Sequence, residues 1–249
     1  MHPYVDPNPE IEFEEQLDGS NEGNVFKVKI NSQPFALKVF KYFNVSEARK
    51  EFETPIDEEI PNEIVEMHCD PFYAECRAYG RINEFYNDTI PEEYEEALRE
   101  FLPKQTQGGE KAVLAAQCYG YLHLSAEDEE SLSEKYPDLD WRSDEEDEGK
   151  PLRALVKQLI DPIDDEGQPD TLQMYDGMRT LHRIGIFPNN NSPPSYRDGR
   201  FMSFSGSYTV PHCAIQALPE VQAEADFEMQ RVDRMIDEQG IEPSMAAVY

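Results

Sequence analysis

Apolar and polar residues alternate along two neighbouring stretches near the N-terminus. Residues 23–30 read GNVFKVKI and residues 35–40 read FALKVF. This period of two predicts β-strands, and the four turn-forming residues between them, 31–34, predict an antiparallel hairpin. Lys38 interrupts the apolar pattern of the second strand, where a charge is costly unless it has a partner.

A helical pattern over residues 70–82 offers that partner. Asp70 is a good N-cap, and Pro71 suits the first helical position. Apolar side chains recur at i, i+4 and i+7 on one face, and Glu75 lies beside that face. We therefore expect Glu75 to pair with Lys38 across the space between helix and strand.

The same reading predicts the other elements and an α+β fold. The first ten residues, 1–10, are expected to form a flexible leader. A small lobe with an antiparallel sheet over residues 11–160 is expected to carry acidic insertions at 41–69 and 126–149. Residues 161–249 are expected to form a truncated, mainly helical large lobe with a C-terminal helix. Strands are expected at residues 11–17, within 112–124 around Gly120, and at 152–160; helices are expected at 171–186 and 219–240.

The net charge of the chain limits which classes of molecule it is expected to bind. The chain of 249 residues has 22 Lys and Arg against 52 Asp and Glu, a net charge of −30. Nucleic-acid affinity comes from cations that neutralise phosphates, so this balance argues against direct nucleic-acid binding and against anionic membranes. It favours basic proteins as partners. The acidic, proline-containing N-terminus does not resemble a signal peptide, and no apolar run reaches membrane-spanning length, which predicts an intracellular protein.

The cysteines give no metal-binding pattern. Cys69, Cys76, Cys118 and Cys213 are widely spaced, without a C-x-x-C pair. His68 and Cys69 are adjacent, but we identified no second His/Cys pair to complete a zinc spacing. We expect reduced thiols and no metal site.

An acidic block dominates residues 126–149. Twelve acidic residues lie between Glu127 and Glu148, against two basic ones. Such blocks are typical of solvated, disordered insertions. The alternative is an electrostatic docking segment for a basic partner, in which aromatic anchors stand beside acidic residues; its candidate residues are Tyr136, Trp141, Asp144, Glu145 and Glu146.

The order of these features resembles the small lobe of a protein kinase. Phe-Ala-Leu-Lys, ending at Lys38, stands where kinases have Val-Ala-Ile-Lys, and Glu75 stands where a helix glutamate pairs with that lysine. Gly23 matches the last glycine of the kinase glycine-rich loop, whose first two glycines are replaced by Asp18 and Ser20. The resemblance implies a residual nucleotide cleft at Lys38, Glu75 and Gly23, weakened by the acidic substitution.

The catalytic positions of that family are degenerate. Residues 181–186, LHRIGI, resemble the end of the kinase helix that precedes the catalytic loop. In this register Asn190 replaces the catalytic Asp, Ser195 replaces the metal-binding Asn, and Ser203 replaces the metal-binding Asp of Asp-Phe-Gly. Asn cannot act as a base, and neutral hydroxyls are weak ligands for Mg²⁺, so the resemblance implies no catalysis.

The wording of several segments also resembles a fungal kinase-like family. Its members are labelled as a centromere-linked kinetochore subunit of the Fta type, and the similarity lies in VFKVKI…ALKVFKYF, DPFYAECRAYGRI, LHRIGI and SFSGSYTVPH. Family members keep Arg-Asp and Asp-Phe-Ser where this chain has Asn189–Asn190 and Ser203–Ser205. The resemblance implies a nuclear, chromatin-associated protein; without it, the expected location is the cytoplasm.

Three hypotheses follow. The first is a catalytically inactive kinase-like protein that binds other proteins and needs no cofactor. The second is a residual ATP-binding protein or atypical kinase that uses Lys38 and Glu75, with ATP and magnesium. The third is an acidic adaptor for basic chromatin proteins, built on residues 127–148.

Overall fold

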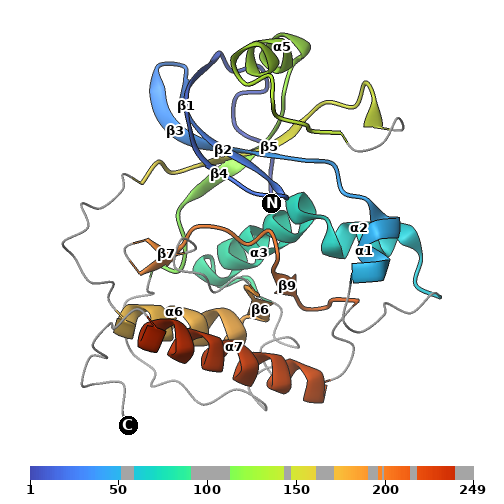
Figure 1. The fold of residues 1–249 in the computed structure, drawn as a ribbon. Coiled ribbons are helices and arrows are strands. Elements are labelled where there is room, and N and C mark those ends of the chain that lie inside the picture. The colour runs from blue at the N-terminus through green and yellow to red at the C-terminus, as the bar shows by residue number, and fades with distance from the viewer. Residues whose placement is uncertain are drawn as a thin grey trace. The chain divides into compact units, whose positions relative to one another are not determined.

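The fold was analysed in a computed structural model (Figure 1). The residues it describes are 1–51, 59–90, 113–142, 147–160, 171–189, 196–197, 199–213 and 218–238.

The chain divides into two compact units. Unit 1 comprises Met1–Cys76 and Gln117–Ile160, and unit 2 comprises Arg77–Ala116 and Asp161–Tyr249. The chain leaves unit 1 for the last time after Ile160. Unit 2 also includes Arg77–Ala116, a segment that the sequence analysis assigned to the small lobe.

Unit 1 is built on a five-stranded antiparallel sheet. The strand order is β1-β2-β3-β5-β4, so the chain leaves β3 and returns to the far edge before it fills the space between. The strands are β1 (Ile11–Gly19), β2 (Gly23–Ile30), β3 (Gln33–Phe40), β4 (Cys118–His123) and β5 (Arg153–Lys157). An antiparallel small lobe was predicted, and the structure has one.

The β2–β3 hairpin turns more tightly than predicted. Ile30 pairs with Gln33, so the turn has two residues, Asn31 and Ser32, both with positive φ. Positive φ at both central positions gives a backbone twist that matches the twist of the flanking strands. The prediction of a four-residue turn is therefore wrong. Pro34 lies within β3, at a position before the pairing of β3 with β5 begins.

The helices of unit 1 include two that the sequence had treated as insertion. The predicted acidic insertion at 41–69 contains α1 (Val45–Glu51) and α2 (Asn62–Cys69). Helix α3 (Pro71–Tyr86) follows directly and runs on into unit 2. Its start agrees with the N-cap prediction, since the Asp70 carboxylate accepts a hydrogen bond from the Phe72 N–H at 2.8 Å.

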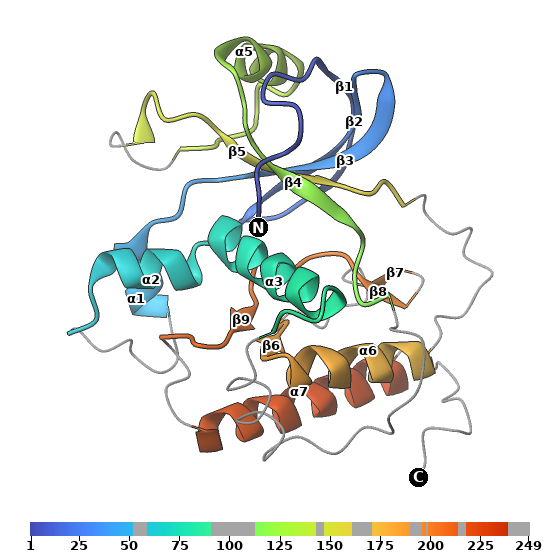
Figure 2. The same ribbon diagram turned by 180° about the vertical axis from the view of Figure 1, so that it is seen from behind.

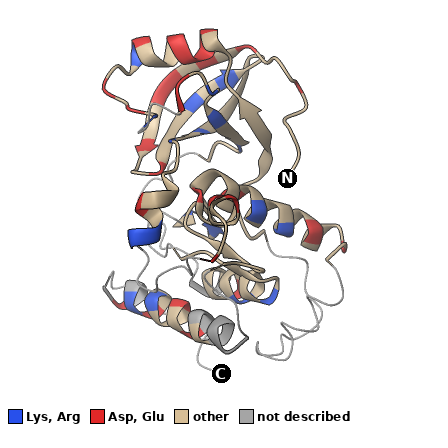
Figure 3. Cartoon of the chain, turned by 90° about the vertical axis from the view of Figure 1, so that its right-hand side faces the viewer, with Lys and Arg blue, Asp and Glu red and all other residues tan. Residues whose placement is uncertain are grey.

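The acidic block is folded where it is described, so the prediction of a disordered insertion is wrong there. Helix α5 (Ala126–Lys135) begins with a capping box in which Ser125 and Asp128 satisfy each other's backbone N–H groups. Its acidic positions colour much of the helix red in Figure 3, but Leu132 is fully buried. Trp141 is 5% exposed, and its ring centroid lies 6.2 Å from that of Phe26.

The N-terminal leader is also ordered against the sheet. The Tyr4 N–H donates to the Tyr121 carbonyl at 2.9 Å, and Pro3 forms a bridge with Tyr121. Gly120 has φ +141°, and a Cβ there would lie 2.7 Å from the Tyr4 nitrogen. A side chain at position 120 would therefore displace residues 3 and 4, and the prediction of a flexible leader is wrong for this part.

Unit 2 contains a helix pair and two short hairpin-like pairings. Figure 2 shows α6 and α7 side by side, and the buried Val232 belongs to α7. The helix predicted over residues 219–240 is thus present and packs part of its apolar face inward. The elements are α6 (Thr171–Arg183), β6 (Ile186–Phe187) paired with β9 (Tyr208–Thr209), β7 (Tyr196–Arg197) paired with β8 (Arg200–Phe201), and α7 (Leu218–Glu238).

None of the helices among the described residues combines the length and the apolar character needed to cross a bilayer.

We predict that the acidic block is needed for the stability of unit 1. Leu132→Ala should lower the free energy of unfolding by about 2–5 kcal/mol, because it removes a buried side chain and leaves a cavity. Urea unfolding followed by circular dichroism measures this. Glu134→Ala, an exposed position on the same helix, is the control and should change stability by less than about 0.5 kcal/mol. Equal, small effects of the two changes would contradict the packing of α5.

Candidate functional site

One buried carboxylate lies between two lysines in unit 1. The Lys38 Nζ is 2.8 Å from Glu75 Oε2, and the Lys157 Nζ is 2.6 Å from Glu75 Oε1. Glu75 is fully buried, and the two lysines are 5% and 4% exposed. The predicted pair is therefore present, and Lys157 is a third member that the sequence reading missed.

Strand register explains how the two lysines meet one carboxylate. Lys38 on β3 lies opposite Leu155 on β5, and Lys157 follows two residues later on the same strand. Residues two apart on a strand share a face of the sheet, so Lys38 and Lys157 are diagonal neighbours. The signal for Lys157 was available, because it is the charged end of the apolar strand LRALVK.

Electrostatics favour the ionised carboxylate. Burial alone would raise the pKa of Glu75, but the Lys157 and Lys38 ammonium groups outweigh it and lower that pKa below the ordinary value of 4.5. Each carboxylate oxygen accepts from a different lysine. With two cations and one anion, the cluster carries one net positive charge.

A second buried ion pair fixes the start of the same helix. Asp70 Oδ2 lies 2.6 Å from Arg153 Nη1, and Arg153 belongs to β5 like Lys157. Burial raises the pKa of Asp70 despite the opposing effect of Arg153. Helix α3 is therefore held to β5 at its N-cap and again in its second turn.

Strand packing, without any phosphate, explains why position 23 is a glycine. A Cβ at this position would lie 2.4 Å from the Val39 carbonyl oxygen, so glycine permits the close approach of β2 and β3. The neighbouring Asn24 accepts a hydrogen bond from Gln16. The structure accounts for Gly23 by strand packing alone.

In unit 2, the segment Ser203–Ser205, which the sequence predicts to occupy the Asp-Phe-Gly position, packs on Tyr79 of α3. The fully buried Phe204 meets Tyr79 edge-on, with ring centroids 5.3 Å apart. The Ser203 and Ser205 hydroxyl oxygens lie 3.2 Å apart. Of the three degenerate positions, Ser203 is described, whereas Asn190 and Ser195 lie outside the described residues.

A buried histidine–glutamate pair was missed by the sequence reading. His182 Nε2 is 2.6 Å from Glu228 Oε2, and the His182 ring stacks on Phe187. Glu228 also accepts a hydrogen bond from the Asn189 N–H. Glu228 stands four residues before the buried Val232 on α7, and this spacing could have indicated an inward-facing carboxylate.

The predicted docking residues are not presented as an exposed segment. Trp141 is buried, and the ring of Tyr136, which is partly buried, lies 5.0 Å from that of Phe26. Asp144, Glu145 and Glu146 lie outside the described residues. The aromatic members therefore contribute to the core of unit 1 rather than to a free surface.

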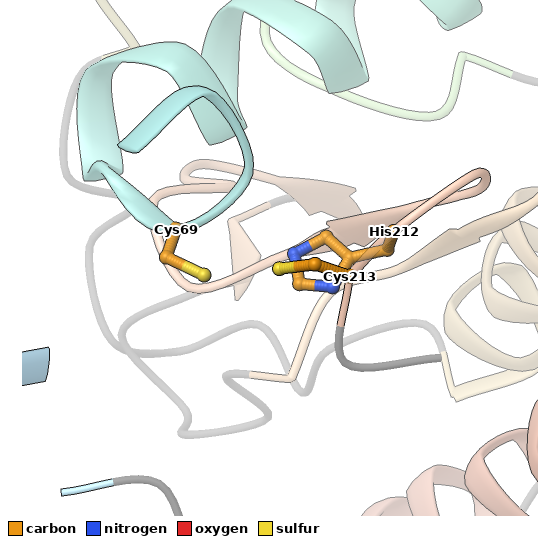
Figure 4. A group of neighbouring side chains, drawn as sticks. All are labelled: Cys69, His212 and Cys213. Carbon is orange, nitrogen blue, oxygen red and sulfur yellow. The ribbon is translucent and has the colours of Figure 1, made fainter. Parts of the chain in front are cut away.

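The metal prediction overlooked a second adjacent His/Cys pair, His212–Cys213. Figure 4 shows these two residues of unit 2, both buried, and Cys69 of unit 1. Among the described residues, neither unit alone brings three such ligands together. The absence of a metal site stays a prediction.

Comparison with protein families gives one match that covers most of the chain. The family is described as kinetochore Sim4 complex subunit FTA2, and residues 1–91 and 104–208 are matched. The chain belongs to this family. Comparison with curated proteins found no match.

Among solved structures, this FTA2-family chain is similar to a crystal structure of the BubR1 kinase domain. The identity is 12%, the TM-score is 0.36, and the match covers 83% of this chain and 51% of that one. The chain thus spans about half the length of the BubR1 chain. The kinase-like α+β fold of the FTA2-family chain is visible in its own unit 1, where a strand lysine pairs with a helix glutamate.

We predict that Glu75 matters more for stability than either lysine. Glu75→Ala leaves two buried ammonium groups without a counter-ion, and removing one partner of a buried pair commonly costs about 3–5 kcal/mol. Lys38→Ala leaves the carboxylate paired with Lys157 and should cost less. Urea unfolding of the single and double variants measures the coupling; strictly additive effects would contradict the ion cluster.

We also predict an acid-dependent share of stability from Glu75. Its folded-state pKa is lowered, so its contribution is present above the unfolded pKa and disappears as pH falls through the folded pKa. The stability difference between wild type and Glu75→Gln should therefore shrink below about pH 4. Urea unfolding from pH 7 to pH 3 measures this, with Glu134→Gln as the exposed control, and a constant difference would contradict the assignment.

Proposed function

We propose that this FTA2-family chain is a catalytically inactive, kinase-like kinetochore subunit that acts by binding other proteins. The observation that carries the proposal is the burial of Glu75 between Lys38 and Lys157. In this arrangement Lys38 serves to hold helix α3 to the sheet. A lysine that is 5% exposed and bonded to a buried carboxylate has little surface left for a phosphate.

The chemistry of the degenerate positions supports the loss of phosphoryl transfer. The reaction depends on magnesium ions held by acidic side chains and on a base for the substrate hydroxyl. In the predicted register Ser203 and Ser195 offer neutral hydroxyls, and Asn190 offers an amide. None of these groups supplies the charge that a hard cation prefers.

Charge and family together support a protein partner. The family is named as a subunit of a complex, which implies contacts with other proteins, and a kinetochore is assembled on chromosomes. A net charge of −30 favours basic partners and disfavours direct binding of nucleic acid. We infer a nuclear protein that reaches chromatin through its protein partners.

A residual nucleotide site is the second candidate. The observation in its favour is the Lys38–Glu75 ion pair, which in kinases accompanies phosphate binding. Gly23 would be its remaining loop residue, although strand packing already accounts for that glycine. The two candidates differ in whether nucleotide stabilises the folded chain.

A thermal-unfolding titration with ATP, with and without magnesium, separates them. We expect no magnesium-dependent shift, because the metal-binding positions are neutral. A ligand present at a hundred times its dissociation constant would stabilise the folded state by about 2.7 kcal/mol, which is readily detected. Lys38→Ala is the matched control: a magnesium-dependent shift that this variant abolishes would overturn the proposal in favour of a nucleotide-binding protein.

A further inference from the structure

A groove in unit 1 is not used by the lysine cluster. It has a volume of about 940 Å³ and lies beside α2, with walls from the chain after β3, the start of α3, the end of β4 and the chain leading into β5. All its lining residues belong to unit 1. We call it the α2 groove.

Aromatic rings supply much of its apolar lining. Tyr42, Phe43 and Tyr73 line the α2 groove, and Tyr73 is 38% exposed. Two apolar side chains on α2 are also exposed, Ile64 at 37% and Met67 at 43%. Ile64 and Met67 do not line the groove, so its own apolar contact comes from the rings, and exposed aromatic side chains are typical of protein-binding surfaces.

The charged residues that line the α2 groove form two ion pairs, and one further carboxylate belongs to neither pair. Arg153 is paired with Asp70, and Lys150 is paired with Asp147 at 2.8 Å. These pairs neutralise each other. Glu66 also lines the α2 groove and is exposed; among the described residues its side chain has no hydrogen bond or ion pair, and its attraction to Lys150 is a minor cause of the raised pKa of that lysine. The charges of the two ion pairs therefore cancel, and the carboxylate of Glu66 gives the α2 groove a net negative charge.

We propose that the α2 groove binds an arginine- or lysine-bearing segment of a partner protein, with Glu66 as counter-ion. The exposed ring of Tyr73 gives the segment an apolar contact beside the Arg153 guanidinium, which already lies 5.7 Å from the centroid of that ring. Charge complementarity selects this occupant, because the chain carries −30 and would repel an acidic segment. The proposal rests on the proposed function as a protein-binding subunit and names where and what it binds.

The test uses an acetylated and amidated pentapeptide, Gly-Arg-Leu-Arg-Gly, titrated into the full ¹⁵N-labelled chain. We expect amide shift changes concentrated at the lining residues of the α2 groove. A peptide in which citrulline replaces both arginines keeps the shape and removes the charge, and it should bind at least tenfold more weakly. Equal binding of the citrulline peptide would overturn the proposal.

Matched variants separate the groove from general attraction to an acidic protein. Glu66→Gln should weaken binding of the arginine peptide at least threefold, and Tyr73→Ala should weaken it similarly. Glu63→Gln removes the same charge from an exposed position on the same helix that does not line the groove, and it should have a much smaller effect. Equal weakening by Glu63→Gln and Glu66→Gln would overturn the proposal.

Two further outcomes are distinguishable. Preferential binding of Gly-Glu-Leu-Glu-Gly at the groove would assign it to anions through Lys150 and Arg153, and the proposal would fail. The ATP titration is independent of this groove, so an inactive protein-binding subunit could stand while the α2 groove is rejected. Thermal unfolding of each variant confirms that a loss of binding is not a loss of folding.

Discussion

The buried carboxylate of Glu75 imposes the main constraint on unit 1. An ionised group without access to water is costly unless cations lie beside it, and here two strands each supply one. Because Lys38 and Lys157 stand on β3 and β5, the helix that bears Glu75 must pack over the middle of the sheet. The hairpin, the return of β5 between β3 and β4, and the orientation of α3 are therefore linked by one charge cluster.

The part of helix α3 that follows Cys76 contacts other residues of unit 2. Arg81 donates to the carbonyl oxygens of Ile184 at 2.9 Å and Val210 at 3.1 Å, and Tyr79 packs on Phe204. Glu75 thus faces the sheet, while the next turns satisfy backbone groups of the second unit.

Several elements could be predicted because their signals are local. Alternation gave β2 and β3, the Asp-Pro start gave α3, and the pairing of Lys38 with Glu75 followed from one costly charge and a nearby helix. Lys157 was missed because its position beside Lys38 depends on the register of β5 against β3, which connects residues far apart in the chain. The His182–Glu228 pair was missed for the same reason, since it joins two helices 46 positions apart.

The sequence by itself determined the α+β class, the main elements of the sheet, the family and the excess of negative charge. Only the tertiary structure showed that the acidic block and the N-terminal leader pack against the sheet of unit 1. Composition marked both as solvated, yet Leu132 and Trp141 are buried in the core, and Tyr4 pairs with β4. The physical reason is that a few apolar side chains at suitable spacing outweigh many exposed charges, because the charges stay in water while the apolar groups leave it.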